Sequence, residues 1–231
     1  DGAAAGRPHP ASRVRTMSDN APSLRRQMAM SAGLLALFAV VGGMLVAGTE
    51  ALTRDRILEQ QRASLRSTLN EVLPAHRYNN ALLDDTMTVQ EPELLGTDET
   101  MTVYRARQGA QSVAVLFPVV APDGYSGDVR LLVGIQANGE LAGVRVLNHR
   151  ETPGLGDAIE TRRSDWIKQF AGLSLNAPPA SAWKVRKDGG EFDQFAGATI
   201  TPRAVIKAVR KALVFFEQNQ ATLFADTPAT P

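Results

Sequence analysis

The 231-residue chain contains no cysteine. This absence excludes iron–sulfur clusters, thiolate zinc sites, thiol nucleophiles, c-type haem attachment and disulfide bonds. Histidine is also scarce, and because His9, His76 and His149 lie far apart, a histidine-based metal site is not indicated. Neither charge sign dominates, since 25 basic residues stand against 24 acidic ones, so nucleic acid is not an expected partner. Any redox chemistry would depend on a group that the amino acids do not provide.

The first 16 residues, before Met17, are small and polar and contain proline, a composition typical of disordered segments. We interpret Met17 as the natural start and residues 1–16 as an upstream extension. Residues 1–27 together are predicted to form a disordered cytoplasmic N-terminus.

One long apolar run follows. No charged residue lies between Arg26 and Glu50, and residues 28–49 are almost wholly apolar. As a helix that rises about 1.5 Å per residue, they span roughly 33 Å, enough to cross the hydrocarbon core of a bilayer. The alternatives are a buried core helix and a cleaved signal peptide, whose apolar region is usually about 7 to 15 residues long. We therefore predict one uncleaved transmembrane helix over residues 28–49, in contact with membrane lipid.

The arginines that flank this helix do not decide its orientation, since equal numbers precede and follow it. They are Arg13, Arg15, Arg25 and Arg26 on one side and Arg54, Arg56, Arg62 and Arg66 on the other. The adjacent pair on the short flank, Arg25 and Arg26, favours a cytoplasmic N-terminus. The C-terminal part would then lie across the membrane.

Residues 50–74 are predicted to continue as a juxtamembrane helix. A mainly apolar stripe recurs at three- and four-residue spacing until Pro74 ends it. The stripe consists of Leu58, Gln61, Leu65, Leu69 and Val72. We expect it to pack on the soluble domain or on a partner.

The rest of the chain predicts an α+β domain over residues 75–220, followed by a flexible tail over residues 221–231. Apolar runs typical of strands occupy residues 101–107, 112–120, 130–137 and 141–149. Asn138-Gly139 between the last two is a strong hairpin signal, so the sheet should be largely antiparallel. Helices should flank it: we expect a short helix over residues 157–170, a strand near residues 182–187 and a final helix that begins at Thr201.

The segment DQFAGATITPRAV, from residue 193, holds two threonines before that final helix. Thr201 followed by Pro202 predicts a helix N-cap with proline at the first helical position. Capping does not explain Thr199, which follows the small residues Gly197 and Ala198. A helix start beside a small-residue turn is a possible phosphate site, although most helix starts bind nothing.

The segment ETPGLG, residues 151–156, is a second candidate binding loop. Pro153 fixes one backbone angle, while Gly154 and Gly156 permit a close approach to a ligand. A tight connection between a strand and a helix is the alternative interpretation. The loop matches neither GxGxxG nor GxxxxGK[ST], so a Rossmann or P-loop nucleotide site is not indicated. His149 just before it is interpreted as a satisfied surface histidine.

Together, the apolar span, NHRETPGLGDAIE and WKVRKDGGEFDQFAGATITPRAV, in this order and spacing, resemble the G subunit of the Rnf (Rsx) ion-translocating electron-transport complex. A more distant similarity is to the C subunit of the sodium-translocating NADH:quinone reductase. The resemblance covers residues 20–220 approximately. It implies an FMN that a separate Mg²⁺-dependent flavin transferase joins, through the flavin phosphate, to a threonine hydroxyl.

The resemblance also implies which residues bind the flavin. Thr199 would be the covalent attachment site within a motif that begins at Asp193. Ala196 departs from the serine or threonine usual at its position in that motif. The remaining cofactor-binding residues would be Glu151, Thr152, Leu155, Gly156, Gly197, Ala198 and Thr201. No catalytic residue and no metal ligand is implied.

The leading hypothesis is therefore a flavoprotein subunit of an ion-translocating ferredoxin:NAD⁺ oxidoreductase, anchored in the inner membrane with its domain in the periplasm. It would relay electrons beside the other membrane subunits of the complex and would not be catalytic alone. The alternatives are a structural anchoring subunit without redox activity and a noncovalent ligand-binding module.

Overall fold

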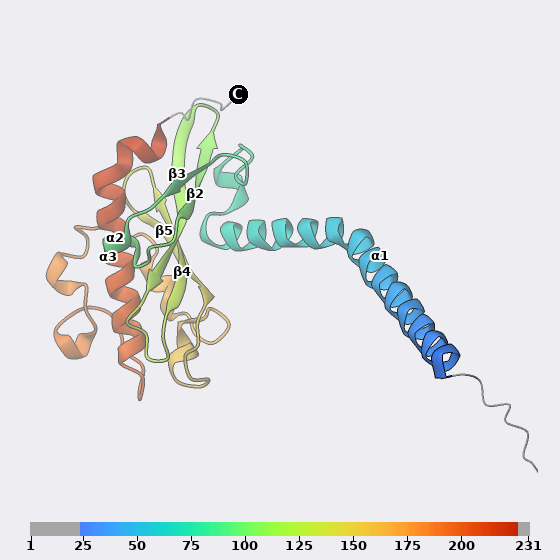
Figure 1. Ribbon diagram of the computed structural model, residues 1–231. Coiled ribbons are helices and arrows are strands. Elements are labelled where there is room, and N and C mark those ends of the chain that lie inside the picture. Colours follow the sequence, from blue (N-terminus) through green and yellow to red (C-terminus); the bar gives the residue numbers. More distant parts are fainter. Residues whose placement is uncertain (1–23, 226–231) are drawn as a thin grey trace, which may run out of the picture. The chain divides into compact units, whose positions relative to one another are not determined.

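The computed structural model describes residues 24–225, so most of the predicted disordered N-terminus (residues 1–27) and of the predicted tail (residues 221–231) lies outside the described residues. Residues 24–27 belong instead to the first helix, and residues 221–224 belong to the last helix. The chain divides into two compact units, with the boundary between Ile57 and Leu58. This boundary falls inside helix α1, which runs over Leu24–Val72. Figure 1 labels α1 and the strands and helices of the second unit.

The first unit consists of the N-terminal part of α1. Its large apolar side chains are exposed, including Leu35, Phe38 and Leu45. Among the described residues, α1 is the one helix long and apolar enough to cross a membrane. A helix that exposes apolar side chains on all sides is stable when lipid surrounds it. This part of α1 therefore indicates that the chain associates with a membrane.

The second unit contains a five-stranded antiparallel sheet whose strands follow chain order (Figure 1). The strands are β1 (Thr86–Val89), β2 (Met101–Gln108), β3 (Gln111–Ala121), β4 (Val129–Gln136) and β5 (Leu141–Asn148). The predicted α+β class, the strands β2 to β5 and the hairpin at Asn138-Gly139 are confirmed. Strand β1 and the short helix α2 (Pro92–Leu95) were not predicted, because each covers only four residues.

Both faces of the sheet are covered, as the nearly continuous apolar runs of β3 and β4 require. Helix α3 (Ile200–Phe224) packs on one face, where the ring of Phe215 meets that of Phe117 at 5.4 Å. The last turns of α1 pack on the other face, against residues that include Leu116 and Leu132. Neighbouring residues of β3 therefore contribute to different cores, as strand alternation dictates.

The end of α1 is held tightly against β4 and β5. Val72 is 2% exposed and lies over Gly134 and Gly143, which pair across the two strands. A Cβ atom on Gly134 would lie 2.4 Å from Cγ1 of Val72. Arg145 of β5 closes this contact, since its Nη2 donates to the carbonyl oxygen of Glu71 at 2.8 Å. The predicted packing of the juxtamembrane stripe on the soluble domain is confirmed for its last turns.

We expect Gly134→Ala to lower the free energy of unfolding by about 1 to 3 kcal/mol, because the added methyl group must displace the stiff side chain of Val72. Gly143→Ala is the matched control. Its Cβ would lie 3.4 Å from the carbonyl oxygen of Val72, an ordinary contact, so little change is expected. Thermal unfolding of the detergent-solubilised chain measures both. Equal melting temperatures for the two variants would contradict this account of the contact.

Two sequence predictions in the region after β5 are wrong. The expected helix over residues 157–170 is replaced by two 3-10 turns, η2 (Gly156–Ile159) and η3 (Trp166–Phe170). Ser164 separates them, because its hydroxyl bonds the carbonyl oxygen of Ala158 at 2.6 Å and accepts the amide of Trp166 at 3.1 Å. Such local side-chain bonds compete with a continuous helix.

The expected strand near residues 182–187 is likewise absent. Turns η4 (Ala180–Ala182) and η5 (Arg186–Asp188) occupy this region, with one bridge between Val185 and Phe192. The backbone instead forms a loop, in which the amide of Arg186 donates to the carbonyl oxygen of Phe192 at 2.7 Å. Stacking of Phe192 on the ring of Phe170 at 5.0 Å anchors this loop in the core.

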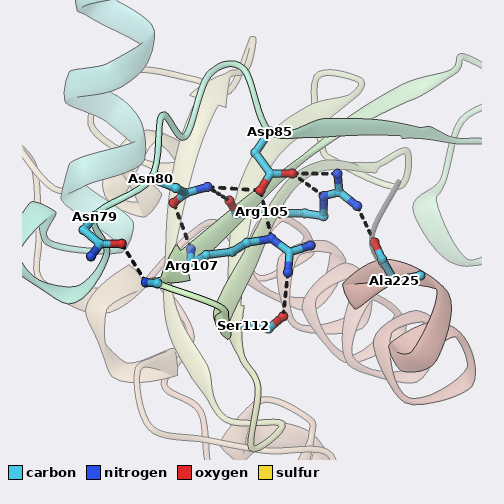
Figure 2. Close-up of polar contacts among 8 residues, drawn as sticks. Asn79, Asn80, Asp85, Arg105, Arg107, Ser112 and Ala225 are labelled. Atoms are coloured by element: carbon cyan, nitrogen blue, oxygen red, sulfur yellow. Dashed lines mark hydrogen bonds and ion pairs between the residues drawn. The ribbon is translucent and has the colours of Figure 1, made fainter. Parts of the chain in front are cut away.

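A charged cluster joins β2 to the end of α3 (Figure 2). Arg105 is 5% exposed, and its Nε donates to Oδ1 of Asp85 at 2.7 Å. Its Nη1 donates to the carbonyl oxygen of Ala225, the C-cap residue of α3, at 2.6 Å. The other carboxylate oxygen of Asp85 accepts from Nε of Arg107 at 2.9 Å and from Nδ2 of Asn80 at 3.1 Å. Asp85 thus organises the cluster.

Candidate functional site

The two segments singled out in the sequence, 151–156 and 197–201, meet at one pocket of about 420 Å³. Seven of the predicted site residues line it, together with two that were not predicted. The lining residues are Tyr125, Glu151, Thr152, Leu155, Gly156, Gly197, Ala198, Thr199 and Ile200. Thr201 is the one predicted site residue that does not line the pocket; it lies fully buried behind the wall.

The loop after β5 builds one wall of the pocket. Pro153 and Gly154 occupy the centre of a turn, in which the amide of Leu155 donates to the carbonyl oxygen of Thr152 at 3.1 Å. Gly154 has a φ of 79°, the value that the third position of a type II turn requires. The amide of Gly154 also donates to Oδ1 of the buried Asp157 at 2.8 Å. The turn therefore has a defined shape that displays Leu155, which is 42% exposed.

The segment before α3 builds the opposite wall. Residues 195–198 form a turn in which Ala198 donates to the carbonyl oxygen of Phe195 at 3.2 Å and Gly197 has a φ of 78°. Nε1 of Trp166 donates to the carbonyl oxygen of Asp193 at 2.7 Å and anchors the start of the segment. Thr199 follows as the N-cap residue of α3, and its side chain makes no capping hydrogen bond.

The prediction that Thr201 caps α3 is wrong. The helix begins at Ile200, so Thr201 lies within its first turn and is completely buried. Its Oγ1 donates to Oε2 of Glu151 at 2.6 Å. A buried carboxylate is costly without donors, and this need explains why the hydroxyl turns away from the helix amides. Pro202 still fits the first turn, where no intrahelical partner exists for its missing N–H.

Glu151 connects three parts of the pocket. It is 4% exposed, and besides the bond from Thr201 its Oε1 accepts the amide of Ser126 at 3.2 Å. Gly156 permits this packing, because a Cβ there would lie 2.5 Å from Oε2 of Glu151. Gly124 does so from the other side, where a Cβ would lie 2.9 Å from Oε1. Glu151 is therefore a buried support of the pocket wall as well as a lining residue.

Tyr125 and Ile200 are the pocket residues that sequence reasoning missed. Tyr125 is 66% exposed and Ile200 is 46% exposed, so both present apolar surface at the opening. An ion pair of 2.5 Å between Lys207 and Asp123 ties the loop that carries Tyr125 to α3, and it lowers the pKa of the Asp123 carboxyl. The sequence signal that could have indicated Tyr125 is its position between two glycines, in the segment GYSG at residues 124–127.

Comparison with known proteins relates this pocket to a family. Residues 124–214 match the FMN-binding domain, and residues 17–72 match the RnfG N-terminal region. The G subunit of the ion-translocating oxidoreductase complex of Pseudomonas aeruginosa is 50% identical over 205 residues, which cover 89% of this chain and 96% of the relative.

Two further relatives carry the same name. The G subunit of Shewanella loihica is 46% identical over 200 residues, covering 87% of this chain and 94% of the relative. That of Vibrio cholerae is 48% identical over 190 residues, covering 82% and 90%. The matched FMN-binding domain contains every residue that lines the pocket. The chain therefore belongs to the family of G subunits of Rnf-type ion-translocating oxidoreductase complexes.

Proposed function

We propose that the chain carries an FMN in this pocket, joined by a phosphoester bond to the hydroxyl of Thr199, and relays electrons within the membrane complex. The observation that carries the proposal is the meeting of Thr199 and the 151–156 loop at one pocket inside the FMN-binding domain. Neither segment alone supplies both an attachment point and a wall for a planar ring.

The residues present fit FMN in size and chemistry. A volume of about 420 Å³ lies in the range typical of small-molecule sites. The apolar side chains of Tyr125, Leu155 and Ile200 offer surfaces for a flat aromatic ring. Thr199 lies at the start of the 25-residue helix α3, whose free amides and dipole favour a phosphate.

The attachment itself requires a second protein. A threonine hydroxyl is a weak nucleophile without an activating base. None of the side chains that line the pocket around Thr199 is histidine, lysine or aspartate, and the carboxylate of Glu151 is engaged by Thr201 and Ser126. We therefore propose that a flavin transferase supplies the activation. The exposed positions of Ala196 and Gly197 leave this segment open to such an enzyme.

The proposed placement combines membrane anchoring with a periplasmic domain. The apolar part of α1 would contact lipid and the other membrane subunits, while Arg25 and Arg26 would keep the N-terminus in the cytoplasm. Bound FMN supplies the electron-transfer chemistry. The role of this chain's residues is to hold the cofactor, orient it and control its access to water.

The proposal is tested on the full chain produced together with a flavin transferase. We expect a fluorescent band at the position of the chain on a denaturing gel under ultraviolet light. Mass spectrometry should find FMN on a peptide that contains residues 193–203. A flavin released into the supernatant by acid precipitation would instead indicate the noncovalent module, and protein without flavin absorption would favour the structural subunit.

A further inference from the structure

His149 lies directly after β5 and before the pocket loop, and it uses both of its ring nitrogens. Nδ1 accepts the backbone amide of Glu151 at 3.0 Å. Nε2 lies 2.8 Å from Oε1 of Glu160. The side chain is only 11% exposed, so His149 is mostly buried and is not the surface histidine expected from the sequence. Both polar contacts are made in a setting that excludes most water.

These contacts determine the protonation state that the site needs. An Nδ1 that accepts an amide hydrogen carries no proton, so the proton must be on Nε2, which donates to Glu160. Arg162 binds both carboxylate oxygens of Glu160. That hydrogen bonding, with the His149 contact as a further cause, lowers the pKa of Glu160 to about 2. Glu160 therefore remains an acceptor between pH 5 and 8.

We infer that neutral His149 is a positioning residue for the pocket, because its Nδ1 holds the backbone at Glu151 in the place from which the carboxylate reaches Thr201 and Ser126. The inference rests on the proposed function in that the pocket is taken to hold FMN. The chain of contacts runs from Glu160 through His149 and Glu151 to the first turn of α3. It joins the segment after η2, the loop after β5 and helix α3.

Protonation of His149 would break this chain at one point. A hydrogen on Nδ1 would face the amide hydrogen of Glu151, so that bond is lost, whereas the contact with Glu160 becomes an ion pair. Imidazole is the side chain that ordinarily changes charge between pH 5 and 8. Several other charged groups lie on the elements that surround His149. Asp157 and Arg163 form an ion pair of 3.1 Å, and Arg150 precedes the pocket loop. The other four line one cleft: Glu71, Arg145, Glu160 and Arg162.

Two substitutions separate the roles of the two ring nitrogens. In His149→Asn the amide oxygen takes the place of Nδ1 and can accept the Glu151 amide in an Asx turn, but it cannot be protonated. In His149→Gln the longer side chain can still reach Glu160, but it offers no acceptor at the position of Nδ1. The asparagine variant should therefore keep the Glu151 position at all pH values, and the glutamine variant should lose it at all pH values.

The first measurement is amide hydrogen exchange at Glu151, by NMR on the flavin-free full chain in detergent micelles, corrected for intrinsic exchange. Wild type should lose protection about five- to tenfold as pH falls from 8 to 5, the change that one ordinary hydrogen bond gives. His149→Asn should show no such loss, and His149→Gln should be low throughout. Wild-type protection that does not vary with pH, or wild-type protection in His149→Gln, would overturn the inference.

The second measurement uses the chain after co-production with the transferase. The visible circular dichroism of bound flavin should follow the same pH profile in wild type and become independent of pH in His149→Asn. A pH-dependent spectrum in His149→Asn equal to that of wild type would overturn the role of His149 towards the flavin. If wild type carries no flavin, the proposed function fails, while the amide measurement alone decides whether His149 positions the loop.

Discussion

Thr199→Ala is expected to abolish the fluorescent band that wild type shows on a denaturing gel. The loss should be complete, because alanine has no hydroxyl to form the phosphoester. Folding should be nearly unaffected. Thr199 is the N-cap residue of α3, but its side chain makes no capping bond that the substitution could remove. The usual N-cap penalty of about 0.5 to 2 kcal/mol should therefore be largely absent.

Matched variants make the result specific. Thr199→Ser keeps a hydroxyl at the same position and should remain fluorescent, whereas Thr199→Val keeps the shape and should not. Thr201→Ser keeps the donor to Glu151 and should be labelled like wild type. A fluorescent Thr199→Ala protein would reject Thr199 as the acceptor and direct attention to Thr201. Equal melting temperatures of wild type and Thr199→Ala exclude misfolding as the reason for a lost label.

The sheet and the pocket segments could be predicted because their signals are local. Strands β2 to β5 are apolar runs bounded by polar or glycine-containing turns, and Asn138-Gly139 specifies its hairpin without help from distant residues. Gly154 and Gly197 were recognisable as turn residues, and both have positive φ values. That the two segments share a pocket follows only from the way in which β5 and α3 are brought together.

The role of Thr201 could not be predicted, because it depends on a residue 50 positions away. Threonine before proline is a good cap in isolation, but the buried carboxylate of Glu151 competes for the hydroxyl. His149 shows the same limitation. The hydrogen bond from the Glu151 amide to Nδ1 is local in the sequence. The partner of Nε2, Glu160, lies 11 residues away and could not be inferred from the sequence.

The region between residues 157 and 192 was mispredicted for a related reason. Its sequence has helical and strand-like stretches, but the packing of a cluster of aromatic rings determines its backbone conformation. Phe170 stacks with Trp183 and with Phe192, at ring distances of 6.3 and 5.0 Å. Burial of these rings outweighs the weak intrinsic preference of the intervening residues. The same region carries Trp166, which anchors Asp193 and thus the start of the attachment segment.

Asp85→Ala is expected to cause the largest loss of stability among these substitutions, about 3 kcal/mol, by leaving the charge of Arg105 buried without its carboxylate. Arg105 is 5% exposed, and of the side-chain contacts that Figure 2 shows for it, the bond to the carbonyl oxygen of Ala225 would remain. For a chain of this size the loss corresponds to a melting temperature lower by about 6 to 12 °C. Thermal unfolding of the detergent-solubilised chain measures it.

Two further variants test whether the loss of stability in Asp85→Ala comes from the buried charge of Arg105 or from the loss of a contact. Asp84→Ala removes the neighbouring exposed carboxylate and should change the melting temperature by no more than about 2 °C, as surface substitutions usually do. Adding Arg105→Met to Asp85→Ala removes the unpaired charge, so part of the lost stability should return. A double variant that is less stable than Asp85→Ala would show instead that the bond to Ala225 matters more than the charge. The end of α3 would then be held by Arg105 alone, with Asp85 serving only to orient it.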